Sequence, residues 1–245
     1  MAEWNTKISV HKDGKSIIRG YELEELVGKI SFASMVSLLL KSSLPTPGEE
    51  KVINAILVSS AEHRLNVSSI VAARSIASTG NSLNASIAGG VLALGELHGG
   101  AIEGLARILQ ENTEEASEIV SSYKANKKRI PGFGHKVYST DPRTQKLFEI
   151  AKSEGVFGKN CEKALKIESE LEKQSGKKLC LNVDGAIAAL ITDMGFSWRT
   201  ANAFFIVPRT LGISAHVVEE FESGKPVRVL REEEVEYSGE LNKKL

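Results

Sequence analysis

Apolar residues recur at helical spacing along almost the whole chain from Tyr21 onward, and this periodicity limits the fold more than any other feature. Side chains three and four residues apart share one face of an α-helix, so the repeat is typical of helices that bury one side. The expected helices contain 23–27, 35–39 and 53–57 and then cover 102–110, 114–123, 144–152, 161–174, 186–194 and 198–221. The sequence therefore predicts an all-α fold.

A short β-hairpin is expected before the helices. Residues 7–19 form two β-prone runs on either side of Asp13-Gly14, a dipeptide favoured in tight hairpin turns. His11 borders this turn, and we expect it at the surface. The predicted fold is thus helical with one N-terminal hairpin.

The longest stretch without charge runs from Ser75 to Gly95 and is interrupted by Ser, Thr, Asn and Gly. These polar and small residues argue against a membrane span and favour two buried helices that approach closely. The same small residues also suit an interface between subunits. Both interpretations, an intramolecular helix pair and a subunit interface, stay open.

Composition limits the partners. The 245 residues contain 31 Lys and Arg and 31 Asp and Glu, so the formal net charge is zero, and no global field attracts nucleic acid or an anionic membrane. An anionic substrate would be bound by local charges. The two cysteines lack metal-ligand spacing and disulfide density, and the N-terminus lacks the pattern of a signal peptide. We therefore expect a cytoplasmic protein.

No linker or internal repeat marks a domain boundary, although charge is densest between about 110 and 178. We expect one unit over 1–245. In it a large helical subdomain covers about 1–105 and 190–245, and a smaller, mobile helical subdomain over about 106–189 opens and closes over a ligand.

The segment from Arg129 to Arg143 combines features that can hold an anion and move a proton. Gly132 and Gly134 let the backbone approach a ligand, and Pro131 stiffens the entry to the loop. His135 titrates near neutral pH, and Arg143 offers a planar fork for a carboxylate. The plain alternative is a glycine turn with a structural histidine, followed by a helix that begins at Asp-Pro-Arg.

Three other histidines are weighed in the same way. His98 precedes two glycines at a predicted helix start, where backbone N–H groups can stabilise an oxyanion; the plain alternative is a helix start with a structural histidine that has a hydrogen-bond partner. His63 follows an apolar helix, where a cation is favoured by the helix dipole, and His216 lies on an apolar helix and is expected in the core. No grouping of His, Cys or Glu has metal-ligand spacing, so metal-free acid/base chemistry fits better.

Two charged residues stand in apolar surroundings. Asp184 begins a predicted helix among apolar residues, where it either caps the helix or acts as an acid with a raised pKa. Arg209 lies in an otherwise apolar run, and a buried arginine needs an anionic partner from the protein or a substrate.

Taken together, these motifs resemble the citrate synthase superfamily over nearly the whole chain. The matches are Arg19-Gly-Tyr, the Leu-rich run from Leu38 to Pro45, Ala-Glu-His63-Arg-Leu-Asn, Leu-His98-Gly-Gly-Ala, Pro-Gly-Phe-Gly-His135 with Asp-Pro-Arg143, Asn-Val-Asp184, and Arg209-Thr-Leu-Gly. They follow one another in the family's order. The resemblance implies a compact citrate-synthase-like helical fold.

Two departures from citrate synthases narrow the resemblance. Only residues 46–60 separate the Leu-Pro segment from the His63 motif, where full-length citrate synthases have a long helical region. Asp184 is followed by Gly-Ala-Ile-Ala instead of the aromatic-Ser-Gly usual in citrate synthases. Both features are similar to citryl-CoA lyases, including the C-terminal module of ATP-citrate lyase.

The resemblance implies cleavage of citryl-CoA to acetyl-CoA and oxaloacetate. His135 would deprotonate the hydroxyl, His98 would steady the enolate oxygen, and Asp184 would protonate the acetyl carbon. The remaining family roles fall on two sets of residues. Carboxylates would be bound by His63, Arg143 and Arg209, and by Arg228 or Arg231 of a neighbouring subunit. Coenzyme A would be met by backbone groups of Pro131, Gly132, Phe133 and Gly134 and by the nearby Lys127, Lys128 and Arg129.

The implied partners are the substrate and products, further copies of the chain in a homo-oligomer, and a separate citryl-CoA synthetase that would supply the substrate. No tightly bound cofactor or metal is implied. Two alternatives stay open. One is a compact synthase that condenses acetyl-CoA with oxaloacetate or another 2-oxo acid, and the other is a non-catalytic subunit that binds coenzyme A.

Overall fold

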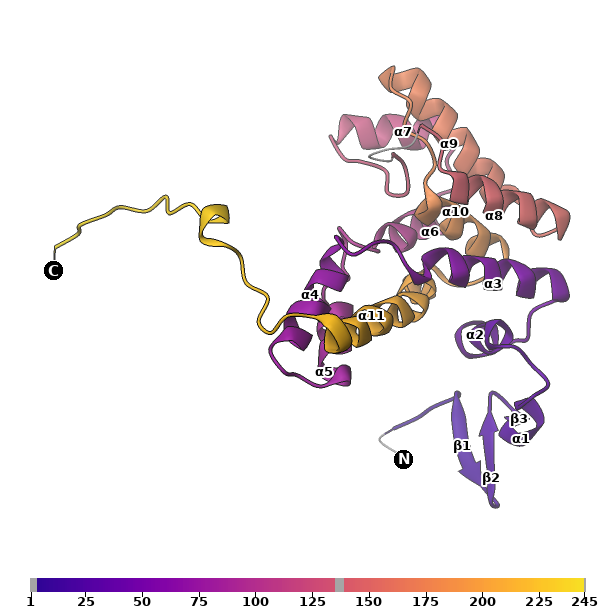
Figure 1. Ribbon diagram of the computed structural model, residues 1–245. Coiled ribbons are helices and arrows are strands. Elements are labelled where there is room, and N and C mark those ends of the chain that lie inside the picture. Colours follow the sequence, from indigo (N-terminus) through magenta and orange to yellow (C-terminus); the bar gives the residue numbers. More distant parts are fainter. Residues whose placement is uncertain (1–3, 135–138, 245) are drawn as a thin grey trace. The chain divides into compact units, whose positions relative to one another are not determined.

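The chain is described here from a computed structural model of residues 4–134 and 139–244 (Figure 1). His135 lies outside the described residues. The all-α prediction is confirmed, with a small sheet at the N-terminus. The elements are β1 (Ser9–Lys12), β2 (Lys15–Ile18), β3 (Tyr21–Glu22), α1 (Leu23–Leu26), α2 (Phe32–Lys41), α3 (Pro47–Ala61), α4 (Ser68–Ser78), α5 (Leu83–Leu92), α6 (Ala101–Glu111), α7 (Ala116–Ala125), α8 (Pro142–Ser153), α9 (Lys159–Ser175), α10 (Val183–Asp193), η1 (Trp198–Thr200), α11 (Ala203–Ser223) and η2 (Glu232–Glu234).

The predicted hairpin is confirmed. Strands β1 and β2 are antiparallel, with Lys12 opposite Lys15, and Asp13 and Gly14 form the turn at φ 53° and 77°. Both angles are positive, as this kind of two-residue turn requires. His11 is exposed, as expected. The short strand β3 pairs with β2 and was not predicted, because two residues carry too little pattern to be recognised.

Polar caps and prolines determine where three helices begin. Thr46 and Glu49 form a reciprocal capping box at the start of α3, and Pro47 occupies its first turn. Asp141 caps α8 and is followed directly by Pro142, just as Thr46 is followed by Pro47. Asn182 caps α10 by accepting the N–H of Gly185, so this helix begins three residues before the predicted start.

The chain divides into two compact units, each described by itself. The first comprises residues 1–62 and 95–209, and the second comprises 63–94 and 210–245, so α11 begins in the first and ends in the second. The expected mobile subdomain over 106–189 concerns movement and stays a prediction.

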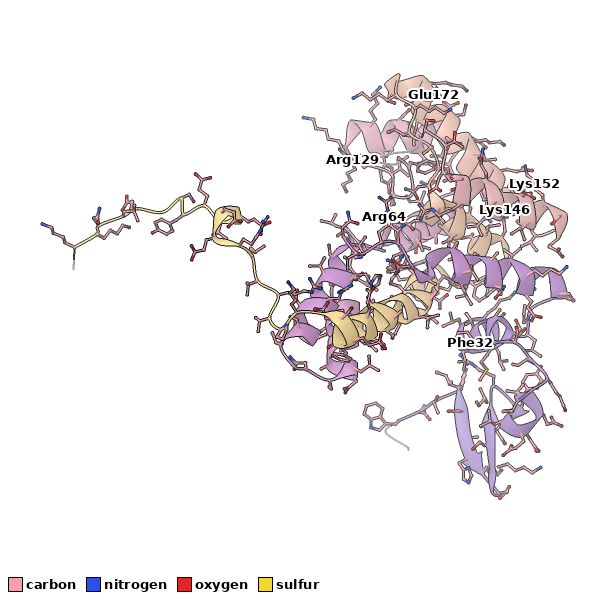
Figure 2. The ribbon with its side chains drawn as sticks, in the orientation of Figure 1. Phe32, Arg64, Arg129, Lys146, Lys152 and Glu172 are labelled. Atoms are coloured by element: carbon pink, nitrogen blue, oxygen red, sulfur yellow. The ribbon has the colours of Figure 1, made fainter. Side chains whose placement is uncertain are left out.

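In the first unit, α10 is the central helix and contacts α6, α8 and α9. Every residue from Gly185 to Ile191 is buried, which is typical of a helix surrounded by others. Charged side chains such as Lys146 and Lys152 on α8 and Glu172 on α9 are exposed (Figure 2). This core supports the loops that precede α8 and α10.

In the second unit, α4 and α5 form the predicted helix pair. A Cβ at Gly90 would lie 2.9 Å from the carbonyl oxygen of Ser69 and 3.0 Å from Cβ of Ala73, so the small residue permits close packing. The expectation that the pair is buried holds only on one side. Leu83 and Leu92 on α5 are 42% and 84% exposed.

Helix α11 differs from the predicted helix 198–221 because η1 and a turn precede it. The stretch Trp198–Ser223 is long and apolar enough to cross a membrane, a property that core helices of soluble proteins share. Its Arg209 is only 2% exposed. His216 was expected in the core but is half-buried, and its Nδ1 lies 3.6 Å from the Glu219 carboxylate.

Candidate functional site

The glycine loop before His135 has the backbone geometry that only glycine adopts easily. Gly132 and Gly134 have φ of 85° and 90°, in the left-handed region. A Cβ at Gly132 would also lie 2.8 Å from the Cα of Gly185. The loop therefore needs glycine at position 132 both for its conformation and for its close contact with α10.

Hydrogen bonds hold this loop against the start of α10. The N–H of Asn182 donates to the carbonyl of Gly132 at 3.0 Å, and the N–H of Gly134 donates to the carbonyl of Cys180 at 2.7 Å. The Asn182 side chain also donates to the carbonyl of Gly134 at 3.0 Å. Asn182 thus caps α10 and binds the loop at once, a role that the sequence analysis missed.

Asp184 lies in the first turn of α10 and is half-buried. A carboxylate is favoured there because the N-terminus of a helix carries partial positive charge. Asp184 also attracts the buried guanidinium of Arg209. The first unit thus holds Asp184 and Arg209 within electrostatic range of each other.

Asp141 supports Arg143 and was overlooked as a functional residue. It is fully buried and accepts Nε of Arg143 at 3.1 Å, Nη2 of Arg143 at 2.8 Å and the backbone N–H of Val183 at 3.1 Å. Burial opposes ionisation, but the hydrogen bonds from Arg143 outweigh it and lower the pKa of Asp141. One carboxylate therefore orients Arg143 and joins the starts of α8 and α10.

Arg209 has an unused donor in the core of the first unit. Its Nε donates to the carbonyl of Ser60 at 3.1 Å, while the buried Nη1 has no hydrogen-bond partner within the part of the chain that the structure describes. Burial lowers the pKa of the Arg209 guanidinium, and the carboxylates of Glu62 and Asp184 oppose this shift. A buried donor without a partner is costly, so the geometry suits an anionic ligand at Nη1.

His98 is held by a tight backbone turn. Its N–H donates to the carbonyl of Gly95 at 2.9 Å, and the N–H of Gly95 donates to the carbonyl of His98 at 3.0 Å. Gly99 follows at φ 93°, where a Cβ would lie 2.7 Å from the ring of Phe205. Burial, and then the charge of Arg209, lower the pKa of the His98 imidazole below its ordinary 6.5, which favours the neutral ring at pH 7.

Phe205 connects His98 to Arg209. The rings of His98 and Phe205 meet edge to face with centroids 6.1 Å apart, and Cζ of Arg209 lies 4.6 Å from the Phe205 centroid. Phe205 was not predicted as a site residue from the sequence. Its position four residues before Arg209, on the same face of a helix, was the available signal.

The other residues predicted to bind carboxylates lie in the second unit. His63 follows the end of α3 and is half-buried. Arg228 donates from Nε and Nη2 to Glu220 of its own chain at 2.8 and 2.6 Å. Arg231 is exposed and pairs with Glu233 and Glu234. Their expected roles toward a substrate stay predictions.

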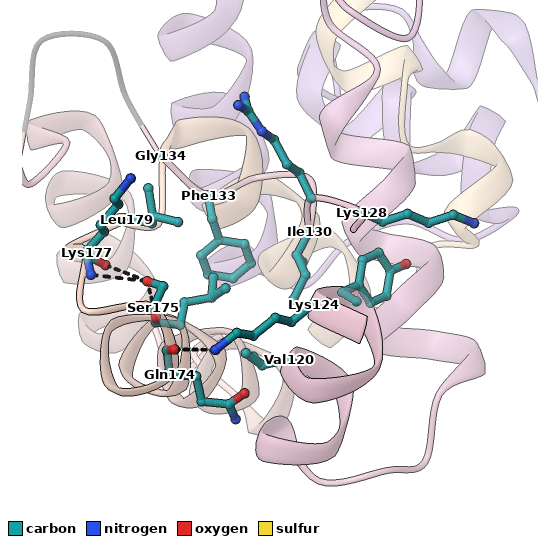
Figure 3. A pocket seen from close by; sticks show the side chains of 13 residues that line it. Val120, Lys124, Lys128, Ile130, Phe133, Gly134, Gln174, Ser175, Lys177 and Leu179 are labelled. Atoms are coloured by element: carbon teal, nitrogen blue, oxygen red, sulfur yellow. Dashed lines mark hydrogen bonds between the residues drawn. The ribbon is translucent and has the colours of Figure 1, made fainter. Parts of the chain in front are cut away.

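A cavity of about 630 Å³ opens beside the glycine loop (Figure 3). Cationic side chains line it together with an apolar floor. Nζ of Lys124 donates to the carbonyl of Gln174 at 2.6 Å, joining the ends of α7 and α9. The lining includes Lys124, Lys128, Arg129, Lys177, Val120, Ile130, Phe133, Leu171 and Leu179. Such a surface suits a ligand with both anionic and apolar parts.

No group of three or more His, Cys, Asp or Glu among the described residues could hold a metal ion. The residues gathered in the first unit are instead a neutral imidazole, a carboxyl group and two guanidinium groups. Such a set can bind carboxylates and transfer protons.

Comparison with known proteins places these residues in a family. A family model described as citrate synthase, C-terminal domain, matches residues 45–230. Citrate synthase 2 of Bacillus subtilis (strain 168) is 32% identical over 194 residues, which cover 77% of this chain and 52% of that protein. Glyoxysomal citrate synthase of Cucurbita maxima is 31% identical over 216 residues, 83% of this chain and 41% of that protein. The chain spans about half the length of these curated relatives.

Two solved structures share the fold. Citryl-CoA lyase from Hydrogenobacter thermophilus is 45% identical with a TM-score of 0.95, and the match covers 100% of this chain and 98% of that chain. ATP citrate lyase from Methanothrix soehngenii, in complex with citrate and coenzyme A, is 25% identical with a TM-score of 0.88, over 100% of this chain and 44% of that chain. Because the family model covers most of the sequence and the glycine loop, Asp184 and Arg209 all lie within it, the chain belongs to the citrate synthase family.

Proposed function

We propose that this protein is a citryl-CoA lyase, which cleaves citryl-CoA into acetyl-CoA and oxaloacetate. The observation that carries the proposal is the contact between Gly185 and the glycine loop. A Cβ at Gly185 would lie 2.5 Å from the carbonyl oxygen of Gly132. The aromatic residue that citrate synthases carry after the catalytic aspartate therefore has no room here. The match to a citryl-CoA lyase over the full length of both chains supports the same choice.

The reaction breaks one carbon–carbon bond and moves two protons. His135 takes the proton of the citryl hydroxyl, and that carbon becomes the carbonyl of oxaloacetate. The bonding electrons pass to the thioester, whose oxygen accepts a hydrogen bond from neutral His98. The Asp184 carboxylate takes up a proton from solvent and delivers it to the terminal carbon. Exchange with solvent restores both groups.

The carboxylates of the substrate need cationic side chains to bind them. Arg209 has a buried Nη1 available, and Arg143 is oriented by Asp141 at its Nε and Nη2. A guanidinium fork can bind a carboxylate through two parallel hydrogen bonds. We assign carboxylate binding to these arginines, with His63 as the third member of the set.

Coenzyme A is assigned to the cavity beside the loop. Lys124, Lys128, Arg129 and Lys177 line it and can neutralise phosphates, and Phe133 with its apolar neighbours can contact the uncharged parts of the molecule (Figure 3). The loop backbone at 131–134 would meet the thioester arm. This extends the expected coenzyme A site from residues 127–134 to the ends of α7 and α9.

A compact citrate synthase is the second candidate. The curated relatives of this chain are named citrate synthases, including those of Bacillus subtilis and Cucurbita maxima. The same residues serve both directions of the carbon–carbon step. The difference lies afterwards, because a synthase must hydrolyse the thioester that a lyase must protect.

We also propose a homo-oligomer in the cytoplasm, supplied with citryl-CoA by a separate synthetase. Leu83 and Leu92 on α5 are 42% and 84% exposed, and Val229 and Tyr237 in the C-terminal segment are 75% and 69% exposed. Apolar side chains exposed on one helix and along an extended segment are typical of surfaces that a further subunit covers. Sedimentation equilibrium tests this, and a concentration-independent monomer contradicts it.

The deciding experiment incubates the purified protein with citryl-CoA and follows four products over time. Oxaloacetate together with acetyl-CoA supports the lyase. Citrate together with free coenzyme A, formed faster than without protein, indicates a synthase. If neither pair is accelerated while coenzyme A still binds, the chain is the non-catalytic binding subunit.

A further inference from the structure

Gly185 occupies a helical position where glycine is unfavourable. It is the third residue of α10, and its N–H donates to the Asn182 side chain at 3.1 Å. Its φ is not positive, so no turn requires glycine there. Glycine within a helix destabilises it relative to alanine. The reason for glycine at this position must be a close contact.

The backbone of Gly185 lies directly against the backbone of Gly132. A Cβ at Gly185 would lie 2.5 Å from the carbonyl oxygen of Gly132 and 2.5 Å from Cδ1 of Leu181. Conversely, a Cβ at Gly132 would lie 2.8 Å from Cα of Gly185. A leucine side chain can rotate away, but a carbonyl oxygen moves only if the loop moves.

Hydrogen bonds to residues 180–182 and close packing against α6 hold the loop in place. The Gly132 carbonyl accepts the N–H of Asn182 at 3.0 Å, and the Gly134 N–H donates to the Cys180 carbonyl at 2.7 Å. In addition, a Cβ at Gly104 of α6 would lie 2.7 Å from Cγ of Pro131. The loop thus contacts both α6 and the start of α10, and any side chain at position 185 would collide with it.

We propose that Gly185 is a positioning residue that sets the separation between the glycine loop 131–134 and Asp184. Gly185 follows Asp184 directly in the chain, and His135 follows the loop directly. A larger residue at 185 moves the loop away from the helix start and misaligns the groups on either side of the contact. This role rests on the proposed lyase function for its kinetic readout, whereas the loop contact itself can be measured without any substrate.

The test compares Gly185→Ala with Gly89→Ala. Gly89 is also a helical glycine, but the atoms nearest to an added Cβ belong to the Ile76 side chain. For Gly185→Ala we expect hydrogen exchange at the amides of Gly134 and Asn182 to rise about tenfold. We expect kcat for citryl-CoA cleavage to fall about a hundredfold, since a displacement of about 1 Å has that effect. Because the loss arises in the transition state, kcat/KM falls by the same factor. Gly89→Ala keeps wild-type values for both.

Further variants keep the test decisive. Adding Leu181→Ala to Gly185→Ala removes the side-chain obstacle but also opens a cavity, because Leu181 is 2% exposed. Activity that stays low compared with Leu181→Ala alone therefore assigns the loss to the loop carbonyl. Recovery in that double variant, wild-type kcat in Gly185→Ala, or lost kcat with unchanged exchange at the loop would each overturn the proposal. If Gly185→Ala does not fold, Gly104→Ala replaces it, because its Cβ would push the loop through Pro131. Wild-type hydrogen exchange and wild-type kcat in Gly104→Ala would likewise overturn the proposal. A wild-type protein that does not cleave citryl-CoA refutes the lyase function, while the exchange measurement still decides the contact.

Discussion

The guanidinium of Arg209 lies over the ring of Phe205, with Cζ 4.6 Å from the ring centroid, and the His98 ring meets the same ring edge to face. Phe205 therefore fixes two groups that the proposed reaction needs. Phe205 itself is buried, at 8% exposure, so both contacts lie away from bulk solvent on its side.

Phe205→Leu should lower turnover more than it lowers stability. The substitution removes a cation–π contact that contributes about 1 to 2 kcal/mol when desolvated, and frees the His98 ring to turn. We expect kcat to fall about tenfold or more, since His98 and Arg209 lose the fixed positions that the transition state needs, and about 1.4 kcal/mol of lost transition-state stabilisation corresponds to this factor. The matched control is Phe204→Leu, which loses the edge-to-face contact with Phe196. Equal kinetic effects in both variants would contradict a specific role for Phe205.

Arg209→Lys should weaken substrate binding. A lysine carries the charge but lacks the second donor of the fork, so it cannot replace Nη1 and keep the bond that Nε makes to Ser60. We expect KM for citryl-CoA to rise about tenfold, the value of one charge-assisted hydrogen bond. Arg199→Lys, at an exposed arginine on Trp198, serves as control. A KM equal to that of the wild type would show that Arg209 does not bind the substrate.

Asp141→Asn should destabilise the protein by about 1 to 3 kcal/mol, because a buried acceptor of several hydrogen bonds is lost. The pKa of Asp141 is lower in the folded state than its ordinary value of 3.8. Its stabilisation is therefore present above about pH 4 and lost as pH falls through the folded pKa. Urea unfolding at pH 7 measures the difference. Glu149→Gln, in an exposed pair with Lys146, should change stability by less than about 1 kcal/mol, and an equal loss there would sink the assignment.

His98 should remain neutral below its ordinary pKa. Burial and Arg209 lower that pKa from 6.5, so protonation of His98 in the fold begins only at more acidic pH. The lowered pKa also links His98 to folding stability. The neutral ring contributes fully to the free energy of unfolding above pH 6.5, and this contribution is lost as pH falls through the folded pKa. Imidazole NMR, assigned with His98→Asn, measures the titration. Phe205→Leu should raise this pKa by admitting water, and a His98 pKa above 6.5 in the wild type would refute the argument.

Glu220→Gln should destabilise the second unit strongly. Glu220 is 4% exposed and accepts Nε of the buried Arg74 as well as Nε and Nη2 of Arg228. Removing one partner of a buried ion pair costs about 3 to 5 kcal/mol. Glu219→Gln is the control, because Glu219 also bonds Arg74 but is 59% exposed at its side chain. Thermal unfolding of both variants decides the matter, and equal shifts would contradict the role of burial.

Local patterns were sufficient to predict much of the fold. Helical periodicity located the helices within a few residues, because burial of one helix face follows from spacing along the chain. Asp13-Gly14 predicted its hairpin, because two positive φ angles are local requirements. The start of α10 was predicted three residues late, since the cap on Gly185 comes from Asn182, whose side chain also binds the loop from 48 residues away.

The sequence by itself determined the residue types of the candidate site: the glycines at 132 and 134, the acid at 184 and the arginine at 209. Tertiary structure decided what those residues do together. Asp141 joins the start of α8 to Val183 of α10, Phe205 joins His98 to Arg209, and Gly185 seats the loop because no side chain fits against the Gly132 carbonyl. These relationships depend on distances between residues far apart in the chain. Spacing along a sequence does not contain such distances, and only packing of the helices creates them.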